Sequence, residues 1–165
     1  NYTAIGNLAI TLSDANKQTY SGYMRSGGGL KSFELAIYSD INDEIGRIEK
    51  FVSHILKVGF RAQDITFLSY GSISKSCFEQ MSDKSNLKLQ SASGNKRTNY
   101  IEYSTAHAFK GLENKVIVLT DVELDSIHAN RNRFYTAITR ATEQVLVLCS
   151  ERSKPDLLKW INQQD

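Results

Sequence analysis

Short apolar segments that alternate with helical ones constrain the fold of this chain more than any other feature. The runs Val116–Leu119 (VIVL) and Val145–Cys149 (VLVLC) carry almost no polar alternation and are too short for buried helices. Strands that are apolar on both faces are typical of parallel sheets covered by helices on both sides. The sequence therefore predicts an α/β fold with a mostly parallel sheet between two helical layers.

The other segments fit this alternation. Further strands are expected at Phe33–Tyr38, Ile65–Tyr70 and Tyr100–Ser104. Helical spacing of apolar residues predicts an amphipathic helix in the first dozen residues and another that follows Asp43, carries an apolar stripe of Ile45, Ile48, Val52, Ile55 and Leu56, and ends near Gly59. Additional helices are expected around Lys75–Met81, at Ala129–Ala141 and from Pro155 to Ile161, with polar loops at Ser21–Ser32 and Ser82–Asn99.

Length and composition indicate one domain that spans residues 1–165. The chain has 165 residues, 41% of them hydrophobic, and no internal repeat. Its net charge of +2 is too small to indicate a nucleic-acid partner by itself. Cys77 and Cys149 stand apart from each other and from any histidine cluster, as expected for buried thiols of a cytoplasmic protein. Because the sequence starts at Asn1 without a methionine or a signal peptide, we expect a fragment of a longer protein.

A glycine-rich segment, Gly22–Ser32, has the composition of a phosphate-binding loop but not its order. A P-loop reads GxxxxGK[ST], with the lysine directly after the last glycine, whereas Leu30 separates Gly29 from Lys31. No acidic Walker B pair follows. We expect this chain to lack both Walker motifs.

The segment Tyr103–Val118 (YSTAHAFKGLENKVIV) is the first that could carry chemistry. Gly111 permits close backbone approach to a ligand, and Glu113 can accept hydrogen bonds from a sugar hydroxyl. Thr105 and His107 can donate to phosphate oxygens. Spacing alone equally allows a solvated connection between two strands.

The second such segment is Arg131–Cys149, where Arg140 lies in an apolar context just before a strand. In a helix, Phe134, Ala137, Ile138 and Ala141 would share one packed side. A permanently charged guanidinium is costly to bury unpaired, so Arg140 requires an anion. That anion is either a structural carboxylate or a phosphate.

Taken together, the two segments resemble a known family. TAHAFKGLE resembles motif V, and FYTAITRA resembles motif VI, of superfamily 1 helicases of the UvrD/Rep type; they occur in the expected order, each beside an apolar strand. The stretch 64–81 is similar to the strand and helix that open the second motor domain of these helicases. The resemblance implies a C-terminal RecA-like motor domain, a three-layer sandwich, of an ATP-dependent DNA helicase.

The resemblance also implies roles for individual residues. Arg140 would be an arginine finger on the γ-phosphate of ATP, Glu113 would contact the ribose and Gly111 would lie close to the nucleotide. Thr105 and His107 would contact a single strand of nucleic acid, expected to be DNA. The P-loop and the Mg²⁺ ligands would come from an N-terminal domain of the same protein, so residues 1–165 alone would not hydrolyse ATP.

One departure from the family pattern keeps an alternative open. Motif IV of the family often reads N-Y-R, with an arginine that serves the phosphates, and this chain begins Asn1-Tyr2-Thr3. The alternative is a helicase-like module that binds nucleic acid or protein without productive ATP hydrolysis. A third hypothesis, a free-standing nucleotide-binding fold unrelated to helicases, would be eliminated by Walker motifs upstream of Asn1.

Overall fold

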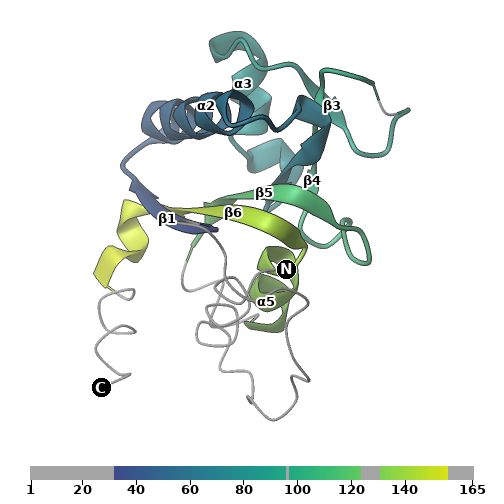
Figure 1. Ribbon diagram of the computed structural model, residues 1–165. Coiled ribbons are helices and arrows are strands. Elements are labelled where there is room, and N and C mark those ends of the chain that lie inside the picture. Colours follow the sequence, from purple (N-terminus) through teal and green to yellow (C-terminus); the bar gives the residue numbers. More distant parts are fainter. Residues whose placement is uncertain (1–31, 96, 124–130, 156–165) are drawn as a thin grey trace.

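A sheet of six parallel strands organises the part of the chain that the structure, a computed structural model, describes: residues 32–95, 97–123 and 131–155 (Figure 1). The strand order is β1-β6-β5-β2-β4-β3. The strands are β1 (Phe33–Tyr38), β2 (Ile65–Ser69), β3 (Leu89–Ser91), β4 (Ile101–Thr105), β5 (Asn114–Val122) and β6 (Ala141–Ser150). The expected parallel sheet is confirmed.

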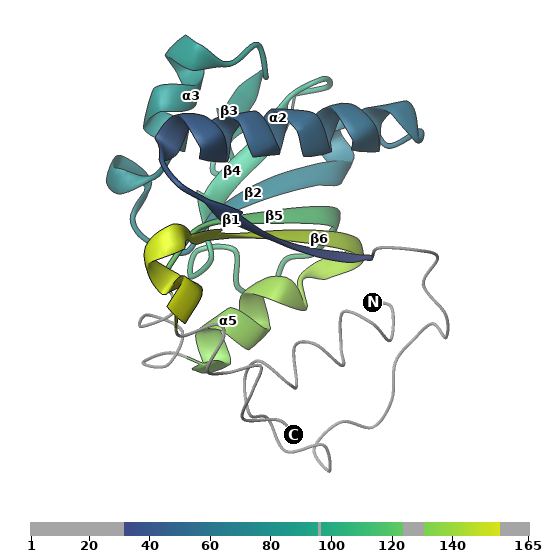
Figure 2. The same cartoon turned by 90° about the vertical axis from the view of Figure 1, so that its left-hand side faces the viewer.

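Helices cover both faces of this sheet (Figures 1 and 2). The helices α2 (Ile41–Lys57) and α3 (Phe78–Lys84) lie on one face, and α5 (Arg131–Ile138) lies on the other. Short 3-10 helices, η2 (Ala62–Asp64), η3 (Ile73–Lys75) and η4 (Glu151–Ser153), complete the elements. Each face has its own cluster of buried apolar side chains, so the three-layer α/β arrangement is confirmed. The helix expected in the first dozen residues lies outside the described residues, as does most of the one expected from Pro155.

The longest helix, α2, begins three residues earlier than expected from Asp43 as its N-cap. Its N-cap is Asp40, whose carboxylate accepts from the backbone amides of Asn42 and Asp43 at 2.8 and 3.0 Å. Asp43 instead lies in the first turn, where negative charge favours the helix dipole. Gly59, at a φ of +103°, follows the end of the helix as expected.

The apolar stripe of α2 is confirmed with one correction. Four of its five expected members are buried, namely Ile45, Ile48, Val52 and Ile55, but Leu56 is 42% exposed. Phe51 is buried instead, because it shares the face of Ile48 and Ile55 at helical spacing.

Several element boundaries differ from the prediction. The strands β5 and β6 are longer than their apolar centres and run for nine and ten residues. Because β6 begins at Ala141, the helix expected to reach that residue ends at Ile138. The expected loop 82–99 contains β3, which among the described strands pairs with β4 alone. Its three residues are partly exposed and show no apolar run.

Both cysteines are buried and free, as expected for reduced thiols. In the described part of the chain, no helix has the length and apolarity that crossing a bilayer requires.

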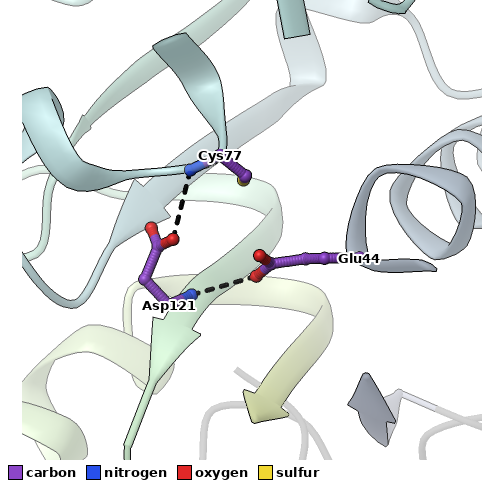
Figure 3. Close-up of side chains that lie close together, drawn as sticks. All are labelled: Glu44, Cys77 and Asp121. Atoms are coloured by element: carbon purple, nitrogen blue, oxygen red, sulfur yellow. Dashed lines mark hydrogen bonds between the residues drawn. The ribbon is translucent and has the colours of Figure 1, made fainter. Parts of the chain in front are cut away.

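Two acids, the buried Glu44 and the partly buried Asp121, join α2 to the end of β5 (Figure 3). Glu44, in the first turn of α2, is 1% exposed, and its Oε1 accepts from the backbone amide of Asp121 at 3.1 Å. The Asp121 carboxylate accepts from the amide of Cys77 at 3.2 Å and from the hydroxyl of Thr120 at 2.8 Å. Asp121 has a φ of +58° at an irregularity in the pairing of β5 with β6. These bonds connect α2, β5 and the start of α3.

Burial keeps Glu44 protonated at neutral pH. It raises the pKa of Glu44 to about 8, with the negative charge of Asp121 adding to the effect. Burial likewise raises the pKa of Asp121 and that of the Cys77 thiol. Potential ligand atoms of Glu44, Cys77 and Asp121 lie within 4.8 Å of one another. Because the carboxylates already accept backbone and hydroxyl donors and Glu44 retains its proton, we interpret the group as a hydrogen-bonded junction.

The junction predicts a pH-dependent stability that Glu44→Gln removes. The folded state holds a proton on Glu44 that the unfolded state releases above the ordinary pKa of 4.5, so stability falls as pH rises from about 4.5 to 8. We expect wild type to lose roughly 2–4 kcal/mol of unfolding free energy over this range through Glu44. The unfolding free energy of the glutamine variant should not fall in this way, because glutamine does not titrate. Urea denaturation at several pH values measures the difference.

Glu79→Gln is the control, because Glu79 is an exposed acid on α3 and its loss should leave the pH profile of wild type unchanged. Parallel profiles for wild type and Glu44→Gln would contradict a protonated junction.

Candidate functional site

The segment 106–113 holds most of the motif V residues. It runs across the sheet from the side where the strands end, the carboxyl-terminal edge, to the side where they begin, the amino-terminal edge. It leaves β4 at the carboxyl-terminal edge, where the amide of Ala106 donates to the carbonyl of Ser69 at 2.9 Å. It enters β5 at the amino-terminal edge, since Asn114 pairs with Ala141 at the start of β6. Ala106 and Phe109 belong to the apolar cluster beneath α5, so the segment crosses on that face.

At the carboxyl-terminal edge, Thr105 organises the turn that opens this segment. Its Oγ1 accepts from the amide of Ala108 at 3.1 Å, and its carbonyl accepts from the amide of Phe109 at 3.1 Å. A hydroxyl that accepts can still donate, so Thr105 retains a proton for a ligand oxygen. His107 is exposed within the same turn. Both residues are available to a partner at this edge.

Near the amino-terminal edge the segment is exposed and needs glycine at one position. Gly111 has a φ of +87°, while a Cβ there would meet nothing within 4 Å. The requirement is therefore for the backbone conformation and not for space. Leu112 is 54% exposed, and Glu113 is exposed beside it.

Arg140 lies at this same edge. The amide of Asn114 donates to the carbonyl of Arg140 at 3.1 Å, which places the end of motif V against motif VI. The guanidinium Nε donates to the carbonyl of Thr136, one turn back, at 3.1 Å. No ion pair between Arg140 and a carboxylate is recorded within the described residues. Arginine has five N–H donors and this bond uses one, so the half-exposed side chain can still bind an anion.

The packing expected around Arg140 is confirmed. Phe134, Ala137, Ile138 and Ala141 are all buried in one cluster beneath the sheet. Tyr135, expected to pack, borders that cluster. Thr3, the departure from motif IV, lies outside the described residues.

The structure thus divides the predicted site residues between two edges. Gly111 and Glu113 lie within a few residues of Asn114, and three residues of chain span at most about 10 Å, so both are near Arg140. Thr105 lies at the opposite edge. A parallel sheet usually binds ligands at the carboxyl ends of its strands, yet the residues expected to contact nucleotide lie at the amino ends. This arrangement suits a nucleotide that another domain holds.

The sequence did not single out a cavity at the carboxyl-terminal edge. Its volume is about 400 Å³, and it lies where β1, β2 and β5 end. Its lining residues are Tyr38, Tyr70, Gly71, Ser72, Lys75, Asp121 and Glu123. One sequence feature could have indicated this cavity. The segments Gly71-Ser72 and Asp121-Val122-Glu123 stand at the ends of strands that are neighbours in a parallel sheet, where ligands usually bind.

Comparison with known proteins adds the family. Residues 100–148, which contain both motifs, match the model of the UvrD-like helicase C-terminal domain. The fold is similar to the crystal structure of the C-terminal domain of a possible DNA helicase from Lactobacillus plantarum, with a TM-score of 0.68 and 9% sequence identity over 91% of this chain and 86% of that one. No curated protein sequence matches the chain significantly. Both motifs therefore lie in the segment that matches the UvrD-like helicase C-terminal domain, and the fold of the chain is similar to that of the possible helicase domain.

Proposed function

We propose that this chain is the C-terminal motor domain of a cytoplasmic, ATP-dependent helicase or translocase. An N-terminal P-loop domain of the same protein would hold ATP and Mg²⁺ and close on the amino-terminal edge of this sheet. The observation that carries the proposal is the hydrogen bond between the Asn114 amide and the Arg140 carbonyl, because it joins the two motifs into one exposed surface.

In the proposed nucleotide contact, Arg140 acts as the arginine finger. Its guanidinium leaves the Thr136 carbonyl and binds the γ-phosphate, where a fixed positive charge stabilises the charge that develops during phosphoryl transfer. Glu113 accepts from a ribose hydroxyl, and the backbone at Gly111 approaches the nucleotide. Since these groups line the surface of one domain only, they act when the partner domain supplies the ATP.

In the proposed strand contact, Thr105 and His107 donate to the phosphates of a single strand, which we infer to be DNA. Phosphate contacts position a strand without reading its sequence, as translocation requires. The segment 106–113 connects this edge to the nucleotide edge within one short stretch of chain. Closure of the two domains around ATP would thus move the residues that contact the nucleic-acid strand, because the same short segment of chain carries both contacts.

Replacement of Arg140 by alanine in the full-length protein tests the finger. We expect the rate of ATP turnover to fall roughly 10³-fold or more, because an arginine finger contributes about 10³–10⁵ to such rates. Lysine should not restore activity, since an ammonium lacks the planar fork of a guanidinium. Arg152→Ala, a change at an exposed residue of η4, is the control and should leave turnover nearly unchanged.

A second candidate, a helicase-like binding module without productive hydrolysis, is favoured by Thr3 where the family often has arginine. The same measurement separates the two. A loss below tenfold in Arg140→Ala, with nucleic-acid binding intact, would support the module.

The isolated chain should not turn over ATP and should bind nucleotide weakly, because its sequence carries no GxxxxGK[ST] motif. Steady-state phosphate release by purified residues 1–165 checks this expectation. Robust turnover would contradict the proposed division of labour between two domains.

Gly111→Ala should disturb the nucleotide edge through its backbone. A side chain at a φ of +87° is strained, so we expect a loss of about 1–2 kcal/mol in stability and a several-fold higher KM for ATP in the full-length protein. Gly46→Ala is the matched control, since Gly46 lies inside α2 with open space around it. That change should stabilise by roughly 0.5–1 kcal/mol and leave KM unchanged.

A further inference from the structure

The outer strand of the sheet, β1, has two chemically different faces. Within the described residues it pairs only with β6, so its other side presents backbone donors and acceptors along a free edge. Phe33, Leu35 and Ile37 point toward the α5 side and are only partly buried. Glu34 and Ala36 alternate with them and line the α2 side. A strand added to this edge would meet an apolar face on one side and a polar face on the other.

On the α2 side, a groove lies between the helix and β1. Its volume is about 380 Å³, within the range of ligand pockets. Its lining residues are Glu34 and Ala36 of β1, Arg47, Lys50, Phe51 and His54 of α2, and Gln144 and Leu146 of β6.

The helical wall of this groove is basic. Arg47, Lys50 and His54 recur at spacings of three and four residues, so they form one exposed stripe along α2, here called the basic stripe. The Arg47 Nε binds Asp43 at 2.9 Å, which leaves the terminal nitrogens of the guanidinium for another anion. Phe51 forms the buried floor between these cations.

We propose that β1 and the basic stripe form a docking site for an extended acidic peptide that adds as a further strand to the sheet. The peptide backbone pairs with the free edge of β1, which is a common mode of peptide recognition. Its acidic side chains reach Arg47 and Lys50, and its alternate apolar side chains continue the row of Phe33, Leu35 and Ile37. An alternating acidic and apolar segment of a partner protein satisfies both faces at once.

Two features favour a peptide over nucleic acid as the occupant. Paired β-strand hydrogen bonds require backbone amides and carbonyls, which a phosphodiester chain lacks. The partly buried row on the α5 side offers apolar contact and no cation to a bound strand. The proposal does not depend on the helicase function, because none of the residues that form the docking site belongs to motif V or motif VI.

Binding of a fluorescent decapeptide of alternating glutamate and valine to the full chain tests the proposal by fluorescence anisotropy. Decapeptides of alternating lysine and valine, and a decathymidylate, serve as comparison probes. We expect the acidic peptide to bind at least tenfold more tightly than the basic one, with weaker binding at higher salt. The double variant R47E/K50E should reduce binding of the acidic peptide at least tenfold. Lys88→Glu is the control, because Lys88 is exposed just before β3, at the far edge of the sheet, and its variant should bind as wild type does.

Amide hydrogen exchange provides the second readout. Bound acidic peptide should slow exchange of the outward amides of residues 33–38 and leave those of β3, at the other edge, unaffected. Equal binding of the acidic and basic peptides would overturn the proposal, as would binding without protection of β1. Tighter binding of decathymidylate that R47E/K50E abolishes would overturn it in favour of a nucleic-acid surface.

Discussion

The backbone hydrogen bond between the Asn114 amide and the Arg140 carbonyl is the contact on which the layout of the candidate site depends. It is made where β5 and β6 both begin, directly after the two motif segments, so it brings Glu113 and Arg140 to one edge although they are distant in sequence. The buried residues on either side hold this edge in place. Phe109 anchors the crossing segment, and Phe134 anchors α5, in the same apolar cluster.

The other end of the crossing segment is held by different bonds. Ala106 pairs with the end of β2, and Thr105 caps the turn that follows β4. At the same edge, the protonated Glu44 side chain accepts from the amide of Asp121 and so ties α2 to β5. One edge of the sheet is therefore braced by buried polar groups, whereas the opposite edge exposes Leu112, Glu113 and a partly free guanidinium. An exposed edge of this kind can serve as a surface that another domain covers only during part of a reaction cycle.

Much of this layout could be predicted from the sequence because it follows from local patterns. The apolar runs at 116–119 and 145–149 are buried strands, and the family resemblance rests on contiguous residues that lie in or beside them. Long-range features could not be predicted in this way. Glu44 and Asp121 are 77 residues apart and meet only once the sheet has formed. The strand β3 forms by pairing with β4, whereas its own three residues show no apolar or alternating pattern that would predict a strand. Asp40 and Asp43 are both reasonable caps, and only the backbone geometry distinguishes them.

The same reasoning explains why the sequence could name candidate site residues but could not predict where in the sheet they lie. A parallel sheet suggests ligands at its carboxyl edge, and the structure puts only Thr105 and the turn with His107 there. The measurement that tests the account most directly is a structure of the full-length protein with a non-hydrolysable ATP analogue and a single-stranded oligonucleotide. The account predicts that the Arg140 guanidinium has left the Thr136 carbonyl for the γ-phosphate, while Thr105 donates to a backbone phosphate at the opposite edge. An Arg140 that stays on Thr136 with nucleotide bound, or a strand that crosses elsewhere, would contradict it.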